Sequence, residues 1–173
     1  MKKLLSLITL FAVSSILFAQ KAGDKIEFSS QDLNSKAVTS EIFSKNKLTM
    51  VNIWGTFCGP CIREMPDLAS LNEANAKNGV QIVGIPIDIV DRKGKLILRA
   101  KNDADGIIKQ TGASYVHIVP SKEMLSGLLK NVQAVPTTIF VDSNGTQIGD
   151  VYLGAKSQGE WQKIIDEILL KIN

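Results

Sequence analysis

The apolar and polar positions of the chain predict strands and helices in succession. Residues 48–54 and 80–89 are almost continuously apolar, which is typical of strands that a sheet buries on both faces. Between them, apolar residues from Ile62 to Leu71 recur at the spacing of one helix face, and Asn78–Gly79 is a helix stop signal. The other predicted elements are a short hairpin (25–28 with 37–38), a helical turn (40–43), helices at 95–110, 122–130 and from Ser157 onward, and strands at 115–119, 137–141 and 146–153.

The order of these elements indicates the fold class. Strand, helix and strand follow one another early in the chain, which is a βαβ pattern, and the chain ends with an antiparallel hairpin and a helix. The hairpin turn is predicted at Asp142–Gly145, and Ser157 with Glu160 forms a capping box that opens the last helix. We therefore predict an α/β fold with a central mixed β-sheet and helices on both faces.

Residues 1–19 have the pattern of an export signal. Lys2 and Lys3 precede an uncharged, mostly apolar stretch, and the small Ala19 makes the bond to Gln20 the candidate cleavage point. An uncleaved membrane anchor is the alternative, although the stretch is short for a bilayer core that needs about 20 apolar residues. Both interpretations place residues 20–173, predicted to form one domain, in the periplasm or cell envelope of a bacterium, where disulfides persist.

The charge balance excludes one class of partner. The whole sequence has 20 Lys and Arg against 17 Asp and Glu, a net charge of +3, and without Lys2 and Lys3 the balance is 18 − 17 = +1. A near-neutral chain with no basic block lacks the electrostatic footprint of a nucleic-acid-binding protein. We therefore predict no nucleic-acid partner.

The candidate chemistry lies in the only two cysteines, Cys58 and Cys61, which follow the buried strand 48–54 and open the predicted helix. The Cys58 sulfur would face the free backbone N–H groups of the helix start and the positive end of the helix dipole, and both favour a thiolate. Cys58 is therefore the predicted attacking thiol, and the more buried Cys61 the resolving thiol. Gly59 leaves the sulfur unobstructed, and Pro60 suits an early helical position.

Two motifs resemble those of a known family. The run Asn52–Cys61, followed by Arg63–Pro66, is similar to the active-site motif of the TlpA/ResA-like thiol-disulfide oxidoreductases of the thioredoxin superfamily, although Phe57 stands where tryptophan is more usual. The run Val135–Thr138 resembles the cis-proline loop of the same family. The resemblance covers roughly residues 22–171 and implies a thioredoxin-like fold, with an N-terminal β extension and an insertion before the cis-proline half.

The resemblance also implies a substrate-binding surface beside the cysteines. A cis bond between Val135 and Pro136 would bring this loop against the cysteines and leave the Val135 backbone free to pair with a substrate strand. Gly59 and Pro60 would border the same surface. Trp54 is the fifth predicted substrate-binding residue, and a place in the core is its equal alternative.

Glu64 is predicted to be catalytic together with Cys58 and Cys61. It follows Cys61 by one helical turn, and in the family a glutamate at the matching position is associated with tuning of the active cysteines. A carboxylate there would raise the pKa of the Cys61 thiol and could accept its proton through water. Asn52 favours this role, because cytosolic thioredoxins usually carry a buried acid at its position. The alternative is a solvated glutamate that pairs with Arg63 or with neighbours near Lys77.

The predicted function is a thiol-disulfide oxidoreductase that reduces protein disulfides outside the cytoplasm, because the Gly-Pro dipeptide between the cysteines resembles that of reducing members of the superfamily. The expected cofactors are none beyond the redox-active Cys58–Cys61 disulfide, and no metal is expected. The family implies a membrane thiol-transporting reductase as electron donor. Its expected substrates are disulfide-bearing extracytoplasmic proteins, apo-cytochrome c among them, and we expect a monomer.

Other functions stay open from the sequence. The same fold serves disulfide oxidants and isomerases, and a difference of only about 30 mV shifts the two-electron equilibrium by about 1.4 kcal/mol. Copper carriers of this fold are a further alternative, although they usually space their cysteines by three residues. A structural disulfide is less favoured, because the small ring would constrain little chain. The single histidine, His117, is predicted to be a surface or satisfied strand residue rather than a metal ligand.

Overall fold

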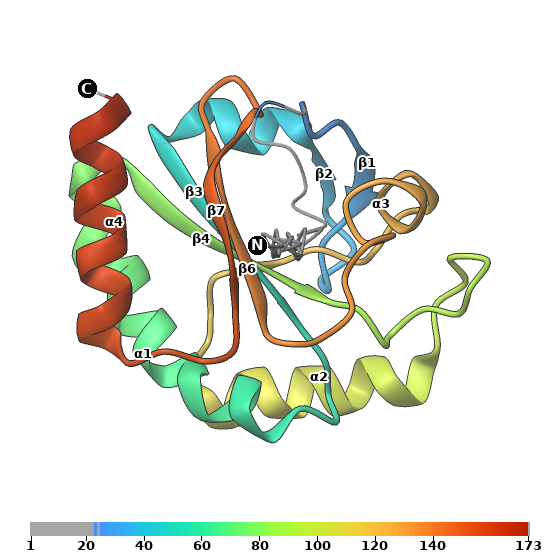
Figure 1. Ribbon diagram of the computed structural model, residues 1–173. Coiled ribbons are helices and arrows are strands. Elements are labelled where there is room, and N and C mark those ends of the chain that lie inside the picture. Colours follow the sequence, from blue (N-terminus) through green and yellow to red (C-terminus); the bar gives the residue numbers. More distant parts are fainter. Residues whose placement is uncertain (1–22, 24, 173) are drawn as a thin grey trace, which may run out of the picture.

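The computed structural model describes residue 23 and residues 25–172, so the export signal predicted for residues 1–19 lies outside the described part of the chain (Figure 1). In chain order the elements are β1 (Ser29–Gln31), β2 (Ala37–Thr39), the 3₁₀ helix η1 (Ser40–Lys45), β3 (Leu48–Trp54), α1 (Gly59–Asn75), the 3₁₀ turn η2 (Ala76–Asn78), β4 (Val80–Pro86), α2 (Leu98–Thr111), β5 (Val116–His117), α3 (Lys122–Ser126), β6 (Thr137–Asp142), β7 (Gln147–Leu153) and α4 (Gln158–Ile172).

The central sheet is mixed, as predicted. Its five strands run in the order β5-β4-β3-β6-β7, in which β3, β4 and β5 are parallel and β6 is antiparallel to both of its neighbours. The first buried strand of the sequence, β3, lies at the centre, and all seven of its residues are buried. A continuous apolar run is what a central strand covered on both faces requires.

Helices cover both faces of this sheet (Figure 1), which confirms the predicted α/β class. The helices α1, α2 and α4 pack on one face around a core that includes Leu68, Ala104 and Trp161. The opposite face is covered by η1, α3 and the segment before the β1–β2 hairpin, with Phe43 and Met124 among its buried residues. The cysteines belong to the first of these layers, because they open α1.

The local stop and start signals are confirmed at several element ends. Gly79 and Gly112 adopt left-handed backbone conformations directly after η2 and α2, with φ of 77° and 70°. At the start of α4, the Ser157 N–H donates to Glu160 Oε2 over 2.9 Å, and the Glu160 N–H donates to Ser157 Oγ over 3.4 Å. This is the predicted capping box.

Several element boundaries differ from the prediction. The helix expected from residue 95 begins at Leu98, because residues 90–96 form a loop closed by the bridge between Val90 and Leu96, with Gly94 in a left-handed conformation. The first hairpin strand begins at Ser29 rather than at residue 25, after Ile26 and Phe28 have packed into the core. The elements β4, β5 and α3 are also shorter than predicted.

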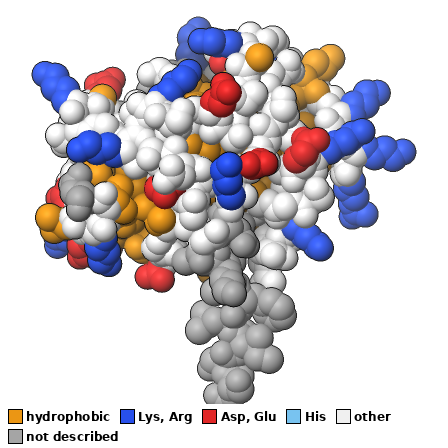
Figure 2. Space-filling model, turned by 90° about the horizontal axis from the view of Figure 1, so that it is seen from above, with side chains coloured by type: hydrophobic (Ala, Val, Ile, Leu, Met, Phe, Trp, Pro, Cys, Tyr) orange, Lys and Arg blue, Asp and Glu red, His pale blue; other side chains and the backbone are white. Residues whose placement is uncertain are grey.

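Basic and acidic side chains are interspersed over the face shown in Figure 2, with apolar side chains in small groups between them. This distribution matches the near-neutral charge balance of the sequence. Among the residues that the structure describes, no helix combines the length and the apolar character needed to cross a bilayer.

A row of residues crosses the sheet two positions before the end of β3. The strand register places Asn52 between Gly84 of β4 and Thr138 of β6, and Gly84 pairs in turn with His117 of β5. The His117 ring lies over Gly84, and a Cβ atom on Gly84 would lie 2.2 Å from His117 Nδ1. Position 84 therefore requires glycine, because a Cβ atom there would collide with the imidazole ring that lies over it.

Replacement of Gly84 should destabilise the protein. Gly84→Ala forces the His117 ring to move, and this ring is held through both of its nitrogen atoms and by stacking on Tyr115, so we expect a loss of about 1–3 kcal/mol in the free energy of unfolding. Gly106→Ala is the matched control: Gly106 lies inside α2, a Cβ atom added there would meet nothing within 4 Å outside its own stretch of helix, and alanine should stabilise by about 0.5–1 kcal/mol. Urea denaturation of both oxidised variants measures the difference, and equal effects would contradict this account.

Candidate active site

The two cysteines form a disulfide at the start of α1, with their Cα atoms 5.3 Å apart. Cys58 is the N-cap residue of the helix, and the Cys61 N–H donates to Cys58 Sγ over 3.2 Å. The buried strand β3 ends at Trp54, so the chain turns directly from the sheet into this helix start. The prediction that the Cys58 sulfur faces a free helical N–H is confirmed.

The two sulfur-bearing residues are not equivalent in exposure. Cys58 is 5% exposed, whereas Cys61 is 0% exposed. Beside them, Phe57 is 71% exposed, and Pro60 is exposed as well. Cys58 therefore lies on the side of the exposed residues Phe57 and Pro60, while Cys61 faces the interior. This is the asymmetry that the helix position predicted.

The predicted cis-proline loop lies against the cysteine motif. The Val135–Pro136 peptide bond is cis, as the family resemblance implied, and the Val135 carbonyl oxygen lies 3.5 Å from Cys58 Sγ. Val135 is half-buried and Ala134 is exposed. Pro136 accepts a hydrogen bond of 2.9 Å from the Gly154 N–H, which ties this loop to the end of β7. Of the predicted substrate-binding residues, Gly59, Pro60, Val135 and Pro136 thus lie around Cys58.

Trp54 does not belong to that surface. Its side chain is 0% exposed, and its indole N–H donates to His117 Nδ1 over 3.3 Å. The core alternative is therefore right, and direct contact with a substrate is the wrong interpretation. Trp54 is the last residue of a strand covered by helices, so its side chain turns inward beneath the cysteine loop.

His117 is a satisfied core residue. It is 4% exposed, accepts from Trp54 at Nδ1, and holds the Ala113 carbonyl oxygen 2.9 Å from Nε2, so the proton belongs on Nε2. Burial lowers the pKa of His117 to about 4, and the imidazole is neutral at physiological pH. The expectation that it is a satisfied strand residue is confirmed, and its buried position rules out the surface alternative.

Sequence reasoning missed the role of Asp88. Both carboxylate oxygens accept from the Thr56 N–H, over 3.0 and 3.1 Å, and the Thr56 hydroxyl donates to the same carboxylate. Asp88 thereby holds the loop that leads to Cys58. The carboxyl ends of neighbouring parallel strands meet at one sheet edge, so an acid after β4 was a signal for a residue near the end of β3.

Glu64 lies in the interior with three hydrogen-bond donors. Its Oε1 accepts from Asn52 Nδ2 over 3.0 Å, and its Oε2 accepts from the Lys156 N–H over 3.2 Å and from Trp161 Nε1 over 3.4 Å. The residue is 4% exposed, so the interpretation as a solvated glutamate is wrong. Burial raises the pKa of Glu64 above its ordinary value, and this outweighs the lowering by the three donors and by the Lys156 charge.

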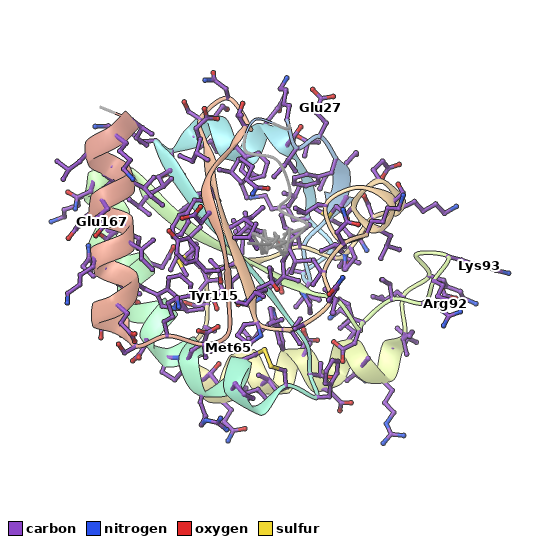
Figure 3. The ribbon with its side chains drawn as sticks, in the orientation of Figure 1. Glu27, Met65, Arg92, Lys93, Tyr115 and Glu167 are labelled. Carbon is purple, nitrogen blue, oxygen red and sulfur yellow. A yellow bond between two sulfur atoms is a disulfide. The ribbon has the colours of Figure 1, made fainter. Side chains whose placement is uncertain are left out.

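The interior beside Glu64 holds a further polar atom. Tyr115 is 7% exposed, and its hydroxyl has no hydrogen-bond partner within the described residues. Burial and the nearby Glu64 charge both raise the pKa of Tyr115, so the phenol stays neutral. Figure 3 shows Tyr115 and Met65 in the interior, whereas Arg92 and Lys93 project from the loop between β4 and α2. That loop leads into residues 90–119, in which the sequence shows no recognisable motif.

No group of three or more His, Cys, Asp or Glu side chains is placed to hold a metal ion among residues 23 and 25–172. The groups brought together at the start of α1 are a disulfide, a helix N–H group and a buried carboxylate. Thiol-disulfide exchange needs no more than these groups.

Comparisons with known proteins agree with this geometry. Residues 21–169 match the Redoxin family. The thiol-disulfide oxidoreductase ResA of Geobacillus kaustophilus is 23% identical over 124 residues, which cover 72% of this chain and 64% of the relative. The thiol:disulfide interchange protein DsbE of Haemophilus influenzae is 28% identical over 139 residues, covering 80% of this chain and 68% of the relative. The chain thus spans about two thirds of the length of these relatives.

A solved structure supports the fold assignment. The crystal structure of a thiol:disulfide interchange protein of the thioredoxin family from Chlorobium tepidum matches with a TM-score of 0.70 at 23% identity, over 86% of this chain and 97% of that chain. Together with the family match, the mixed sheet and the cysteines at the start of α1, this leads to one assignment. The chain belongs to the Redoxin family, as a TlpA/ResA-like member of the thioredoxin superfamily.

Proposed function

We propose that this protein is an extracytoplasmic thiol-disulfide oxidoreductase that reduces protein disulfides with the Cys58/Cys61 pair. One observation carries the proposal: the Cys58 sulfur receives a helical N–H over 3.2 Å and lies 3.5 Å from the carbonyl oxygen before Pro136. The N–H stabilises a thiolate on the sulfur that a substrate can reach. The adjacent Val135 backbone offers main-chain groups that can pair with the substrate chain.

The first step forms a mixed disulfide. The Cys58 thiolate of the reduced protein attacks one sulfur of a substrate disulfide, the new S–S bond forms, and the other substrate sulfur leaves as a thiolate. The exposed residues Phe57 and Pro60, together with Gly59 and Val135, border the approach to Cys58. They are the proposed substrate contacts. Trp54 packs in the core with the two cysteines and has no direct contact with the substrate.

The second step releases the substrate. Cys61 loses its proton and attacks Cys58 Sγ, so the Cys58–Cys61 disulfide forms and the second substrate sulfur leaves as a thiolate. The substrate has then gained two electrons and the protein has lost two. Glu64 is the proposed acceptor of the Cys61 proton, because it lies one helical turn further and its raised pKa makes its carboxylate a stronger base.

The cycle requires an electron donor and a compartment. A membrane thiol-transporting reductase is the proposed donor, since it would return the disulfide to the dithiol. Export through residues 1–19, with residues 20–173 as a monomeric single domain, is the proposed route to the periplasm or cell envelope. The proposed substrates are disulfide-bearing proteins, with apo-cytochrome c as a candidate. The proposed redox group is the Cys58–Cys61 disulfide itself, without a bound cofactor or metal.

A disulfide oxidant or isomerase is the second candidate. It would use the same attack at Cys58, and the direction depends on the reduction potential of the pair, in which a tenfold change of the equilibrium constant is only about 30 mV. We favour the reductant because of the Gly59–Pro60 dipeptide between the cysteines. A potential measured against glutathione separates the two, and a value near that of strong oxidants would reverse the proposed direction.

Loss of the resolving thiol should trap substrates. In Cys61→Ser the mixed disulfide on Cys58 cannot be resolved, so disulfide-linked adducts should accumulate on non-reducing gels of cell-envelope fractions. Cys58→Ser is the matched control, because its remaining thiol is 0% exposed and should form few adducts. Adduct yields that are equal in the two variants would contradict the assigned roles.

Glu64→Gln should slow resolution and stabilise the fold at neutral pH. A Cys58 mixed disulfide with 5-thio-2-nitrobenzoate reports resolution by release of the coloured thiolate, and we expect a rate at pH 7 lower by at least about tenfold.

The folded-state pKa of Glu64 lies above its unfolded value, so its contribution to stability is present below pH 4.5 and is lost as the pH rises through the folded pKa. The variant avoids this loss, so its free energy of unfolding should exceed that of the parent at pH 7.

The exposed Glu73 of the same helix provides the control for both measurements. Glu73→Gln removes a solvated charge, so resolution and its pH dependence should stay as in the parent. An unchanged resolution rate in Glu64→Gln would remove Glu64 from the mechanism while leaving the roles of the cysteines intact.

A further inference from the structure

The connection between β7 and α4 closes over the Glu64 carboxylate. Glu64 Oε2 accepts from the backbone N–H of Lys156, in this connection, over 3.2 Å, and from the indole N–H of Trp161, in α4, over 3.4 Å. Lys156 is half-buried, and its neighbours Ala155 and Ser157 are exposed. A loop with exposed residues on both sides of Lys156 therefore contacts the Oε2 atom of this buried carboxylate.

The ammonium group of Lys156 packs over two aromatic rings and does not contact the Glu64 carboxylate. Its Nζ lies 5.6 Å from the ring centroid of Trp161 and 5.9 Å from that of Tyr152, and these two rings meet edge to face at 5.7 Å. A cation held over ring faces is confined by the ring quadrupoles. No ion pair joins the described side chains of Lys156 and Glu64, so the cation acts on the carboxylate at longer range.

The same connection is tied to the wall beside Cys58. The Gly154 N–H donates to the Pro136 carbonyl oxygen over 2.9 Å, and Leu153 pairs with Thr137 in the last register position of the β6–β7 ladder. Gly154 adopts a φ of 82°, which lets the chain turn from the strand toward Lys156. Only Ala155 thus lies between the residue that donates to the cis-proline loop and the residue that donates to Glu64.

We propose that Lys156 is a positioning residue of the redox site: its backbone orients the Glu64 carboxylate behind Cys61, and its ring-held ammonium keeps that carboxylate ionised and ready to accept a proton. The inference rests on the proposed role of Glu64 as proton acceptor. It adds the group that prepares Glu64 and the loop that connects this group to the cis-proline wall.

The groups that face Glu64 leave Lys156 as the source of the favourable charge. Cys61 lies on the same helix, Tyr115 lies before β5, and the other contacts, Asn52 and Trp161, are uncharged. Burial raises the pKa of Tyr115, so its phenol is neutral when Glu64 titrates. Lys156 is the cation, among the described residues, whose charge lowers the pKa of Glu64.

Lys156→Met tests the charge without removing the backbone donor or the apolar stem. The readout is the side-chain carboxyl ¹³C titration of Glu64 in the oxidised protein, assigned by its loss in Glu64→Gln. We expect the titration midpoint of Glu64 to rise in Lys156→Met and to return to the parent value in Lys156→Arg, which restores the cation. Lys163→Met, on the exposed face of α4, is the matched control and should leave the midpoint unchanged.

The same variants in the 5-thio-2-nitrobenzoate release assay separate the two hypotheses. A pH profile of resolution that moves to higher pH in Lys156→Met and returns to the parent profile in Lys156→Arg supports the inference, because a carboxyl group with a raised pKa becomes a base only at higher pH. A midpoint in Lys156→Met equal to that of the parent overturns it, and the proposed function stands if Glu64→Gln still slows resolution. A raised midpoint with a parent-like resolution rate in both Lys156→Met and Glu64→Gln supports control of the Glu64 charge by Lys156 but refutes Glu64 as the proton acceptor.

Discussion

The buried carboxylate of Glu64 is the constraint around which the redox site is arranged. An ionised group without partners is unstable in an apolar interior, so the fold must bring hydrogen-bond donors to it from several elements. The donors come from Asn52 at the sheet centre, from Trp161 on α4 and from the backbone of Lys156. These hydrogen bonds connect α1 to the sheet, to α4 and to the loop before α4, one helical turn from Cys61.

This constraint also explains the two-sided character of the start of α1. On the outer side, Cys58 accepts the Cys61 N–H and lies beside the Val135 carbonyl group, where a substrate can approach. On the inner side, Cys61 and Glu64 lie one turn apart, away from bulk water. In the proposed mechanism, electron exchange with the substrate and proton exchange with the protein therefore proceed on opposite sides of one helix end.

Part of this arrangement follows from local sequence. A continuous apolar strand, two cysteines at a helix start, glycines after helices and a capping box act over a few residues, and the sequence predicted each of them correctly. The contacts that were missed join distant residues. Asp88 holds Thr56 across two parallel strands, His117 reaches Trp54 over Gly84, and the Lys156 N–H finds a carboxylate 92 residues away. Such pairs depend on register and layer packing, which no local pattern encodes.

The free-energy cost of burying the Glu64 carboxylate supports its proposed role as a proton acceptor. Glutamine could accept the Lys156 and Trp161 hydrogen bonds through its amide oxygen, without the desolvation of a charge, although its amide nitrogen would then face the Asn52 side-chain amide. For the fold alone, a neutral acceptor or an apolar residue would be the less costly choice at neutral pH. What a carboxylate adds, and neither alternative provides, is an exchangeable proton one helical turn from Cys61. In the proposed mechanism the raised pKa has a chemical use, because it brings the affinity of this carboxylate for a proton closer to that of a thiol.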